Sequence, residues 1–274
     1  TYRGTMIRTN KNQNAKKRNY LEGVKEHRVK ESTMVFGIRA VIEAIAAGKD
    51  FDRILLRRDM SSAIARELID ALKGKEIAIQ RVPREKLDRM TEKNHQGVIA
   101  FLSQISYQKI EDIVPFVFEQ GKVPFFVILD GVTDVRNFGA IARTCECAGV
   151  DAIIIPTQGA ASINADAIKT SAGALHNIAV CRTENLTNCI NFLAESGIKI
   201  VAATEKATKN YTQCSMKEPI AIVMGAEDVG INSERLKLCE EQVRIPMSGK
   251  IASLNVSVSA GILIYEVLRQ RENF

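Results

Sequence analysis

Three polar segments that contain glycine carry the side chains most suited to binding a ligand. They span residues 129–144, 222–230 and 243–260, and each includes the end of an apolar run with strand character. In open α/β sheets, ligands usually bind outside the carboxyl ends of the strands. The three segments are therefore candidates for one binding site.

The first segment places Asn137 and Arg143 after a polar loop. Asn137 stands where it could cap the helix that holds Arg143, and Gly139 with Ala140 would allow close backbone approach at the start of that helix. Arg143 lies in an otherwise apolar helix. Taken alone, its simplest interpretation is an arginine at the helix edge with its guanidinium in solvent.

The other two segments combine glycines with hydrogen-bonding side chains. Gly225 can bring main chain against a ligand, and Glu227 can accept hydrogen bonds, although an acidic residue also suits the start of a helix. Ser253 and Asn255 fit the N-cap region of the last helix, so capping is the alternative to a binding role. Each of these signals is weak alone.

Common nucleotide and metal signatures are missing. The glycines at 131–139 do not form G-x-G-x-x-G, and no G-x-x-x-x-G-K-[ST] occurs, which disfavours a nicotinamide-dependent oxidoreductase and nucleoside triphosphate chemistry. None of the six cysteines forms a C-x-x-C pair, and the three histidines are distant from them. We expect reduced, mostly buried thiols and no metal site.

The elements that must position the three segments alternate between strands and helices. The apolar runs predict strands at 125–129, 152–155, 198–202, 220–224 and 243–245. The helical patterns between and after them span 138–148, 165–175, 186–196, 233–239 and 256–271. Short apolar strands alternating with helices predict an α/β fold with a parallel sheet covered on both faces.

A smaller α/β unit precedes this domain. Helices are predicted at 37–47, 61–72 and 83–90, and strands at 53–58, 76–82 and 97–102. We expect a basic, disordered tail over 1–31, a small domain over 32–105, a linker with one helix over 106–122, and the large domain over 123–274.

The formal net charge of +6 is concentrated at the N-terminal end. Residues 1–31 hold nine Lys or Arg and three Glu, the small domain carries +3, and the rest carries −3. A basic segment on a neutral body predicts a polyanionic partner, with a solubilising leader as the alternative. The first 20 residues are polar and no apolar run approaches the roughly 20 residues that cross a bilayer, so we expect a cytoplasmic protein without a membrane partner.

Together and in this order, the three segments resemble the motifs of the TrmH-type RNA ribose 2′-O-methyltransferases of the SPOUT class. The matching patterns are N-x-G-A-x-x-R-T from Asn137, M-G-x-E-x-x-G from Met224 and I-P-M-x-G-x-x-x-S-L-N-V-S-V from Ile245. The resemblance covers nearly all of residues 125–271. One departure is Val135-Arg136, where many members have Pro-His before the asparagine.

Residues 34–103, with Phe36-Gly37-Ile38 and His95-Gln96-Gly97, resemble the ribosomal-protein-like substrate-binding domain of the RlmB-like branch. The resemblance implies a trefoil-knotted α/β domain, a homodimer with an active site built across the subunit interface, and S-adenosylmethionine bound in the knot. The residues implied to bind this cofactor are Gly225, Ile245, Met247 and Leu254.

The implied reaction moves a methyl group to a ribose 2′-hydroxyl of RNA, with a guanosine of large-subunit rRNA as the expected target. The residues implied to act in it are Asn137, Arg143, Glu227, Ser253 and Asn255. Because a guanidinium almost never loses its proton, we expect Arg143 to orient a phosphate and stabilise the developing alkoxide, with Glu227 and Asn255 positioning both Arg143 and the loops. The alternatives are the same chemistry on tRNA or on a ribosomal adenosine, and a catalytically silent RNA-binding protein on this scaffold.

Overall fold

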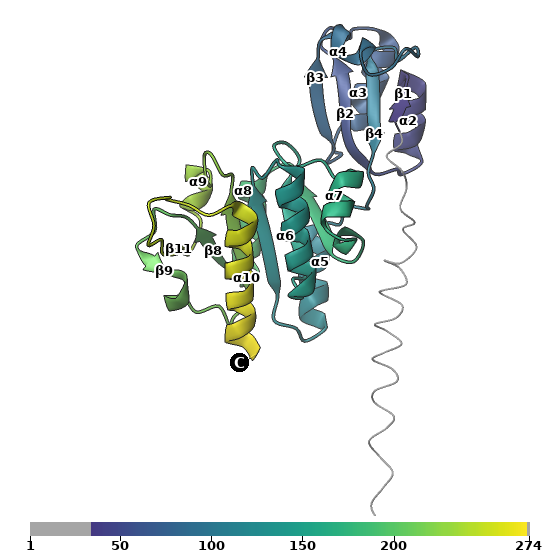
Figure 1. Ribbon diagram of the computed structural model, residues 1–274. Coiled ribbons are helices and arrows are strands. Elements are labelled where there is room, and N and C mark those ends of the chain that lie inside the picture. Colours follow the sequence, from purple (N-terminus) through teal and green to yellow (C-terminus); the bar gives the residue numbers. More distant parts are fainter. Residues whose placement is uncertain (1–33, 273–274) are drawn as a thin grey trace, which may run out of the picture.

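The computed structural model describes residues 34–272 and shows two α/β domains (Figure 1). The predicted basic tail, residues 1–31, lies outside the described residues. The smaller domain has a four-stranded sheet in the order β1-β4-β2-β3, in which only β2 and β3 are parallel. Its elements are β1 (Met34–Phe36), α2 (Ile38–Ala46), β2 (Phe51–Arg57), α3 (Ala63–Leu72), β3 (Ala78–Val82), α4 (Arg84–Asp88) and β4 (Val98–Leu102).

The larger domain has a seven-stranded, entirely parallel sheet in the order β7-β6-β5-β10-β8-β11-β9. Its strands are β5 (Phe125–Asp130), β6 (Ala152–Pro156), β7 (Ala179–Thr183), β8 (Lys199–Ala203), β9 (Lys209–Asn210), β10 (Ile220–Gly225) and β11 (Glu241–Arg244). Its α-helices are α5 (Ile110–Glu119), α6 (Val135–Cys147), α7 (Ala165–Thr170), α8 (Leu186–Glu195), α9 (Ser233–Leu236) and α10 (Val256–Glu272). The predicted α/β class with a parallel sheet is confirmed.

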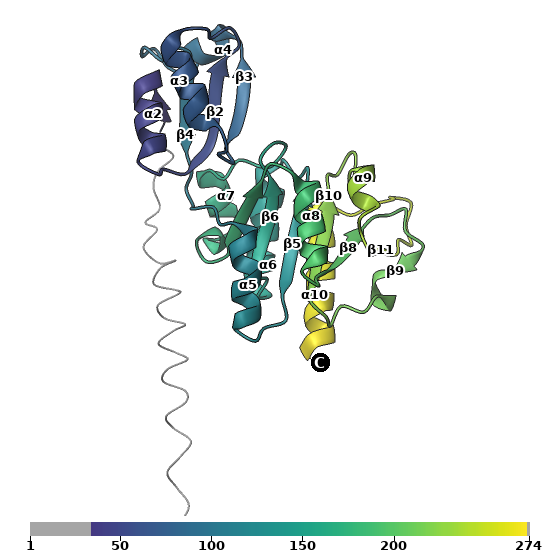
Figure 2. The same ribbon diagram turned by 180° about the vertical axis from the view of Figure 1, so that it is seen from behind.

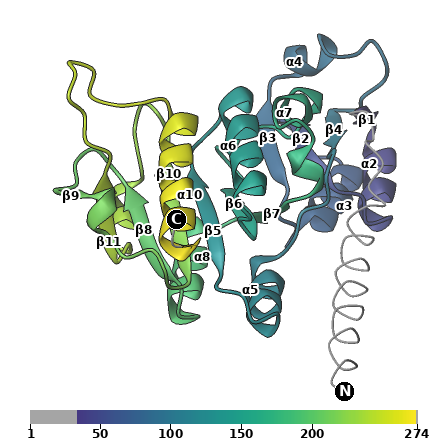
Figure 3. The ribbon, with the colours of Figure 1, turned by 60° about the horizontal axis from the view of Figure 1, so that its bottom comes forward.

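Helices cover both faces of the large sheet. Helices α6, α7 and α10 pack on one face, and α5 and α8 pack on the other (Figures 1 and 2). α6 and α10 lie side by side, as Figure 3 also shows from below. The segment 106–122, predicted to be a linker, contributes α5 to the same buried core as α8, through Ile113 and Val117.

Parts of the predicted pattern were wrong. The helix predicted over 165–175 ends at Thr170 and is followed by a 3₁₀ turn, because Ala172 and Gly173 adopt positive φ angles of 51° and 83°. A right-handed helix cannot continue through that conformation. The helix predicted over 233–239 ends at Leu236, and strands β1, β7 and β9 were not predicted.

Buried polar contacts tie the two domains together. From β7, the Arg182 guanidinium donates to the carbonyls of Phe51 (2.7 Å) and Asp52 (3.2 Å) and lies over the Tyr107 ring. The Asp52 carboxylate accepts hydrogen bonds from Ser162 Oγ (2.5 Å) and from the Ile163 amide (2.9 Å), in the loop after β6. The smaller domain therefore sits at the carboxyl edge of the large sheet.

The strand that leads into the third motif, β11, is anchored by a charged cluster. Lys199 is buried, and its ammonium lies 2.6 Å from a Glu241 carboxylate oxygen and 3.0 Å from one of Glu218. Lys209 pairs with the other oxygen of Glu241. The hydrogen bonds from Lys199 and Lys209 lower the pKa of Glu241 from 4.5 to about 2.

This pKa predicts a specific acid sensitivity. A lowered pKa in the folded state stabilises the fold above pH 4.5, and this stabilisation is lost as the pH falls towards 2. We expect Glu241→Gln to lower the free energy of unfolding by about 2 kcal/mol at neutral pH, and by progressively less below pH ~4.5. Urea unfolding measured against pH checks this expectation, with the exposed neighbour variant Glu240→Gln as the control. A difference in the free energy of unfolding between the wild type and Glu241→Gln that does not change with pH would contradict this expectation.

Within residues 34–272, none of the helices combines the length and apolar character needed to cross a lipid bilayer.

Candidate active site

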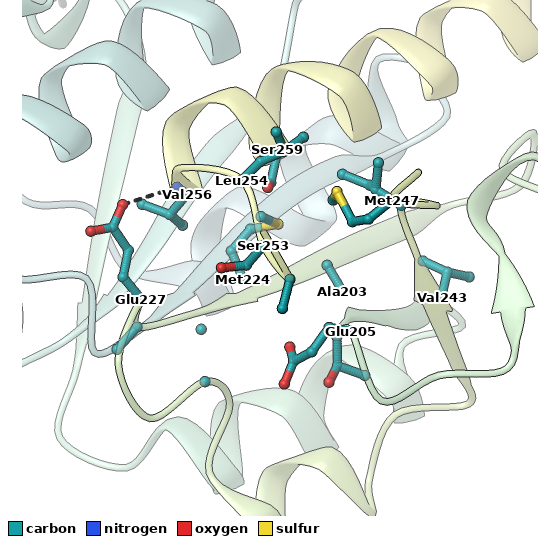
Figure 4. A pocket seen from close by; sticks show the side chains of 16 residues that line it. Ala203, Glu205, Met224, Glu227, Val243, Met247, Ser253, Leu254, Val256 and Ser259 are labelled. Carbon is teal, nitrogen blue, oxygen red and sulfur yellow. Dashed lines mark hydrogen bonds between the residues drawn. The ribbon is translucent and has the colours of Figure 1, made fainter. Parts of the chain in front are cut away.

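A cavity that is open to solvent lies between the loops that follow β8, β10 and β11 (Figure 4). Gly225, Ile245, Met247 and Leu254, the four residues predicted to bind a cofactor, all line it. The loop after β8 contributes Glu205, which lies across the cavity from Leu254 in Figure 4. The rule that ligands bind at the carboxyl ends of strands covers this loop, but none of the three motifs includes it.

Gly225 is required by the way the chain folds back after β10. A Cβ atom at this position would lie 2.3 Å from both the Gly230 carbonyl carbon and the Ile231 nitrogen, far inside van der Waals contact. The Gly230 amide donates to the Ala226 carbonyl at 2.9 Å, which closes the loop between them. The glycine therefore lets this loop lie directly against the end of the strand.

The Glu227 carboxylate joins the three motifs. Its Oε1 atom accepts hydrogen bonds from Asn255 Nδ2 (2.7 Å), Asn137 Nδ2 (3.2 Å) and the Val256 amide (3.1 Å), the last of which is drawn in Figure 4. Asn255 Nδ2 also donates to Asn137 Oδ1 at 3.0 Å. Three residues distant in the sequence thus form one hydrogen-bonded group, which we call the Glu227 cluster (Asn137, Glu227, Asn255).

The caps of α6 and α10 fix two members of this cluster. Asn255 Oδ1 accepts a hydrogen bond from the Ser257 amide (3.0 Å), which caps α10 as predicted. The prediction that Asn137 caps α6 was wrong. Asp134 is the N-cap and accepts from the amides of Arg136 and Asn137, which leaves the Asn137 side chain free to reach Glu227.

Ser253 lines the cavity, is exposed, and forms no hydrogen bond within residues 34–272. It lies before the Asn255 cap and does not cap α10 itself.

Arg143 lies apart from this cluster within one chain. Its side chain is exposed on α6, does not line the cavity, and has no hydrogen bond or ion pair in the described part of the chain. The prediction that Glu227 and Asn255 position Arg143 is therefore wrong within a single chain, because both bond to Asn137. Arg143 remains available to a ligand or to another subunit.

A carboxylate missed by sequence reasoning holds the second motif in place. Asp130, buried at the end of β5, accepts hydrogen bonds from the Asn232 amide (3.0 Å) and from Arg235 Nη1 (2.5 Å). These contacts tie the end of the 226–232 loop to the strand beside β10. In the sequence, Asp130 is marked only by its position as an acidic residue directly after the apolar strand predicted over 125–129.

The cysteines do not enter the site. All six thiols are free, and Cys145, Cys181, Cys189 and Cys214 are buried. Burial raises the pKa of each of these four. Among residues 34–272, no three His, Cys, Asp or Glu side chains come together in a way that could hold a metal ion.

The fold and the three joined motifs define a known class of RNA-modifying protein. Residues 124–265 match the model of the SpoU rRNA Methylase family, and residues 34–108 match the model of RNA 2′-O ribose methyltransferase substrate binding. The chain belongs to the SpoU rRNA methylase family and is an RNA methyltransferase.

Curated relatives and solved structures agree with this assignment. YacO of Bacillus subtilis, a TrmH-family tRNA/rRNA methyltransferase, is 35% identical over 86% of this chain and 95% of its own. The 23S rRNA (guanosine-2′-O-)-methyltransferase RlmB of Yersinia pestis is 35% identical over 88% of this chain and 98% of its own. The crystal structure of an RNA 2′-O ribose methyltransferase covers 88% of this chain and 90% of its own, with 25% identity and a TM-score of 0.52.

The crystal structure of AviRb from Streptomyces viridochromogenes, solved with AdoMet, is 21% identical and shares the fold. It covers 93% of this chain and 98% of its own, with a TM-score of 0.57.

Proposed function

We propose that this protein transfers a methyl group from S-adenosylmethionine to the ribose 2′-hydroxyl of a guanosine in large-subunit rRNA. The observation that carries the proposal is the Glu227 cluster, which joins all three motifs at the wall of one cavity. The rRNA target is supported by the relative named for 23S rRNA, and the smaller domain supports a large structured substrate. Action on rRNA fits a cytoplasmic location.

The cavity suits S-adenosylmethionine. Apolar side chains such as Met224 and Val243 line it, and Gly225 brings main chain to its edge, which fits a flat adenine recognised by shape and backbone groups. Gly225, Ile245, Met247 and Leu254 would hold the cofactor. The bound cofactor supplies an electrophilic methyl group on a positively charged sulfur.

The remaining residues act on the RNA. A neutral 2′-hydroxyl is a poor nucleophile, so the site must position it and share its proton as the bond forms. Arg143 carries a charge that is not neutralised by a partner in the described chain, which suits a phosphate next to the reacting ribose and an oxygen gaining negative charge. The Glu227 cluster fixes Asn137 and Asn255, and Ser253 stands exposed at the cavity wall to bond the substrate.

We further propose a homodimer and a knotted chain. α10 exposes Val258 (50%) and Tyr265 (49%), and the loop before it exposes Ile251 (78%), so apolar surface is available for a second copy. Arg143 does not reach the Glu227 cluster of its own chain. In a homodimer, the exposed Arg143 of one subunit would complete the site of the other. The trefoil knot is supported by the path of the chain, which passes from β10 to β11 beyond β8 and returns as α10 beside α6 and β10.

We expect Gly225→Ala to disable the cofactor site. The added methyl group would overlap backbone atoms at 2.3 Å, so the 226–230 loop must move, at a cost of about 1–3 kcal/mol. Urea unfolding measures the loss of stability, and calorimetric titration with S-adenosylmethionine measures the loss of cofactor affinity. Gly261→Ala, in α10, is the control, because a Cβ there would lie 4.0 Å from the nearest atom, Thr144 Cγ2. Normal cofactor affinity in Gly225→Ala would contradict the assignment of this loop.

The tRNA alternative is supported by the relative whose name covers both tRNA and rRNA. Labelled S-adenosylmethionine offered with separate pools of unmodified rRNA and tRNA decides between them. We expect label in the large-subunit rRNA. Label in tRNA alone would overturn the rRNA target, and cofactor binding without any transfer would favour a silent RNA-binding protein.

A further inference from the structure

Within the described part of the chain, much of one face of the smaller domain's sheet has no helix packed over it. α2 and α3 pack on the other face, where Ile54 and Leu56 are buried (Figure 2). On the face in question, the short helix α4 covers part of the sheet by packing Leu87 against Leu55 and Ile99. The rest of this face includes the partly exposed side chains of Met34, Phe36, Arg53 and Phe101.

These side chains form a row across three neighbouring strands. Arg53 of β2 pairs with Phe101 of β4, and Phe101 pairs with Met34 of β1. Residues directly opposite each other in a sheet project to the same face, so the three lie next to one another. Phe36 lies further along β1 on the same face, where Lys93 Nζ is 5.0 Å from the centre of its ring.

Arg53 is stacked but not neutralised. Its guanidinium carbon lies 4.7 Å from the centre of the Phe101 ring. Within residues 34–272, Arg53 forms no ion pair, and its Nε atom is buried without a hydrogen-bond partner. An arginine held against an aromatic ring and left without a carboxylate presents a flat cationic surface. RNA bases stack on such guanidinium planes and on aromatic rings, and their phosphates are attracted to the charge.

The row also lies at the end of the sheet that meets the methyltransferase domain. Asp52, next to Arg53, is bound by Ser162 and Ile163 of that domain. Gln158 Nε2 donates to the Ile79 carbonyl on the adjacent strand at 3.1 Å. RNA bound on the row would therefore continue onto the domain that carries the candidate active site.

From these observations we propose that Phe101, Arg53 and Phe36 form a stacking surface for unpaired bases of the RNA substrate. This inference rests on the proposed function, in which RNA is the substrate. It adds a mode of recognition, because bases inside an A-form duplex are already stacked and cannot lie on a protein surface, whereas bases of a loop or bulge can.

Binding of a short oligoadenylate that contains 2-aminopurine tests the surface in the full chain. We expect Phe101→Leu, which keeps most of the apolar volume, and Arg53→Gln each to weaken binding of the single strand about ten-fold. The change in 2-aminopurine fluorescence on binding should be smaller in both variants than in the wild type, because the base no longer stacks on the protein. Because Phe101 carries no charge, Phe101→Leu should leave the salt dependence unchanged.

Two controls make the outcome decisive. Arg66→Gln removes an exposed arginine on α3, at the covered face, and should leave single-strand affinity within about two-fold. A duplex of the same length should bind both stacking variants as well as it binds the wild type. Wild-type affinity of Phe101→Leu and Arg53→Gln for the single strand, or equal weakening by Arg66→Gln, would overturn the proposal.

The oligonucleotide assay needs neither cofactor nor catalysis. Failure of the stacking surface would therefore leave methyl transfer by the wild type intact. If the proposed function is wrong, the wild type transfers no methyl group. The Phe101 and Arg53 variants would still bind the single strand more weakly than the wild type.

Discussion

Replacing Arg143 by alanine should reduce methyl transfer by about 10³-fold while S-adenosylmethionine binding stays within a few-fold of the wild type. Arg143 is exposed, has no partner in the described chain and does not line the cofactor cavity, so its loss removes positive charge without disturbing a packed contact. Single-turnover transfer to rRNA measures the first effect, and calorimetry measures the second.

The matched control is Arg66→Ala, which removes another exposed arginine from a helix of the smaller domain. It should retain nearly full activity. Arg143→Lys should recover little, because an ammonium cannot hold a phosphate in the bidentate manner of a guanidinium. A folded Arg143→Ala protein that has lost cofactor binding, or that transfers methyl groups at the normal rate, would contradict the catalytic role of Arg143.

A mixing experiment tests whether this arginine serves the partner's site. If the proposed homodimer forms, the Arg143→Ala and Glu227→Ala proteins are each expected to be inactive when assayed alone. If the site is shared between subunits, a mixed dimer has one site with both residues intact, and random mixing should restore about a quarter of the wild-type activity. No recovery in a preparation shown to exchange subunits would mean that both residues act within the same chain.

Replacing Glu227 by alanine should have the second large effect, a loss of activity of about 10²-fold or more. One carboxylate oxygen, Oε1, receives the hydrogen bonds of Asn137, Asn255 and the Val256 amide. Without it, Asn137 Nδ2 and the Val256 amide lose their acceptor and Asn255 Nδ2 keeps only Asn137 Oδ1, so the side chains of the cluster and the start of α10 lose their fixed positions. Activity, cofactor affinity and thermal unfolding should be measured together, since the variant removes structure as well as charge.

Glu227→Gln separates these two contributions. Because only Oε1 accepts hydrogen bonds from the cluster, the amide oxygen of glutamine can take its place while the charge is lost. We expect this variant to keep its thermal stability and to lose about ten-fold or less in activity. Asp228→Ala, at the exposed neighbouring position, is the control. If Gln is as inactive as Ala in a folded protein, the charge itself is essential and the positioning account is wrong.

The sequence predicted those parts of the fold that depend on local pattern. Strands β5, β6, β8 and β10 are apolar runs close to their predicted bounds, and α3, which Ser62 caps through the Ala65 amide, lies within the helix predicted over 61–72. β11 spans Glu241–Arg244, so the prediction over 243–245 found only its second half. β7 was missed because its five residues include Arg182, and its burial is explained only by the carbonyls of Phe51 and Asp52 in the other domain. A contact between residues so far apart in the sequence leaves no pattern in the residues next to Arg182.

In the candidate site, too, local patterns could be predicted from the sequence and long-range contacts could not. Motif order identified the three segments, and the family resemblance that they carry implied that Gly225, Ile245, Met247 and Leu254 share one site; all four line the same cavity. The pairing within the site could not be predicted. Whether Glu227 bonds Asn137 or Arg143 depends on the rotation of α6 about its axis, and that rotation is set by packing against α7 and α10. Gly139 shows how close this packing is, since a Cβ there would lie 2.7 Å from Thr170 Cβ.

The position of the transferred methyl group distinguishes transfer to a ribose from transfer to a base. Unmodified large-subunit rRNA is incubated with the full chain and methyl-labelled S-adenosylmethionine, and then hydrolysed with alkali. Methylation of a 2′-hydroxyl blocks cleavage at that nucleotide, so the account predicts that the label remains in alkali-resistant dinucleotides, and that Arg143→Ala leaves none. Label released in mononucleotides would place the methyl group on a base and contradict the account.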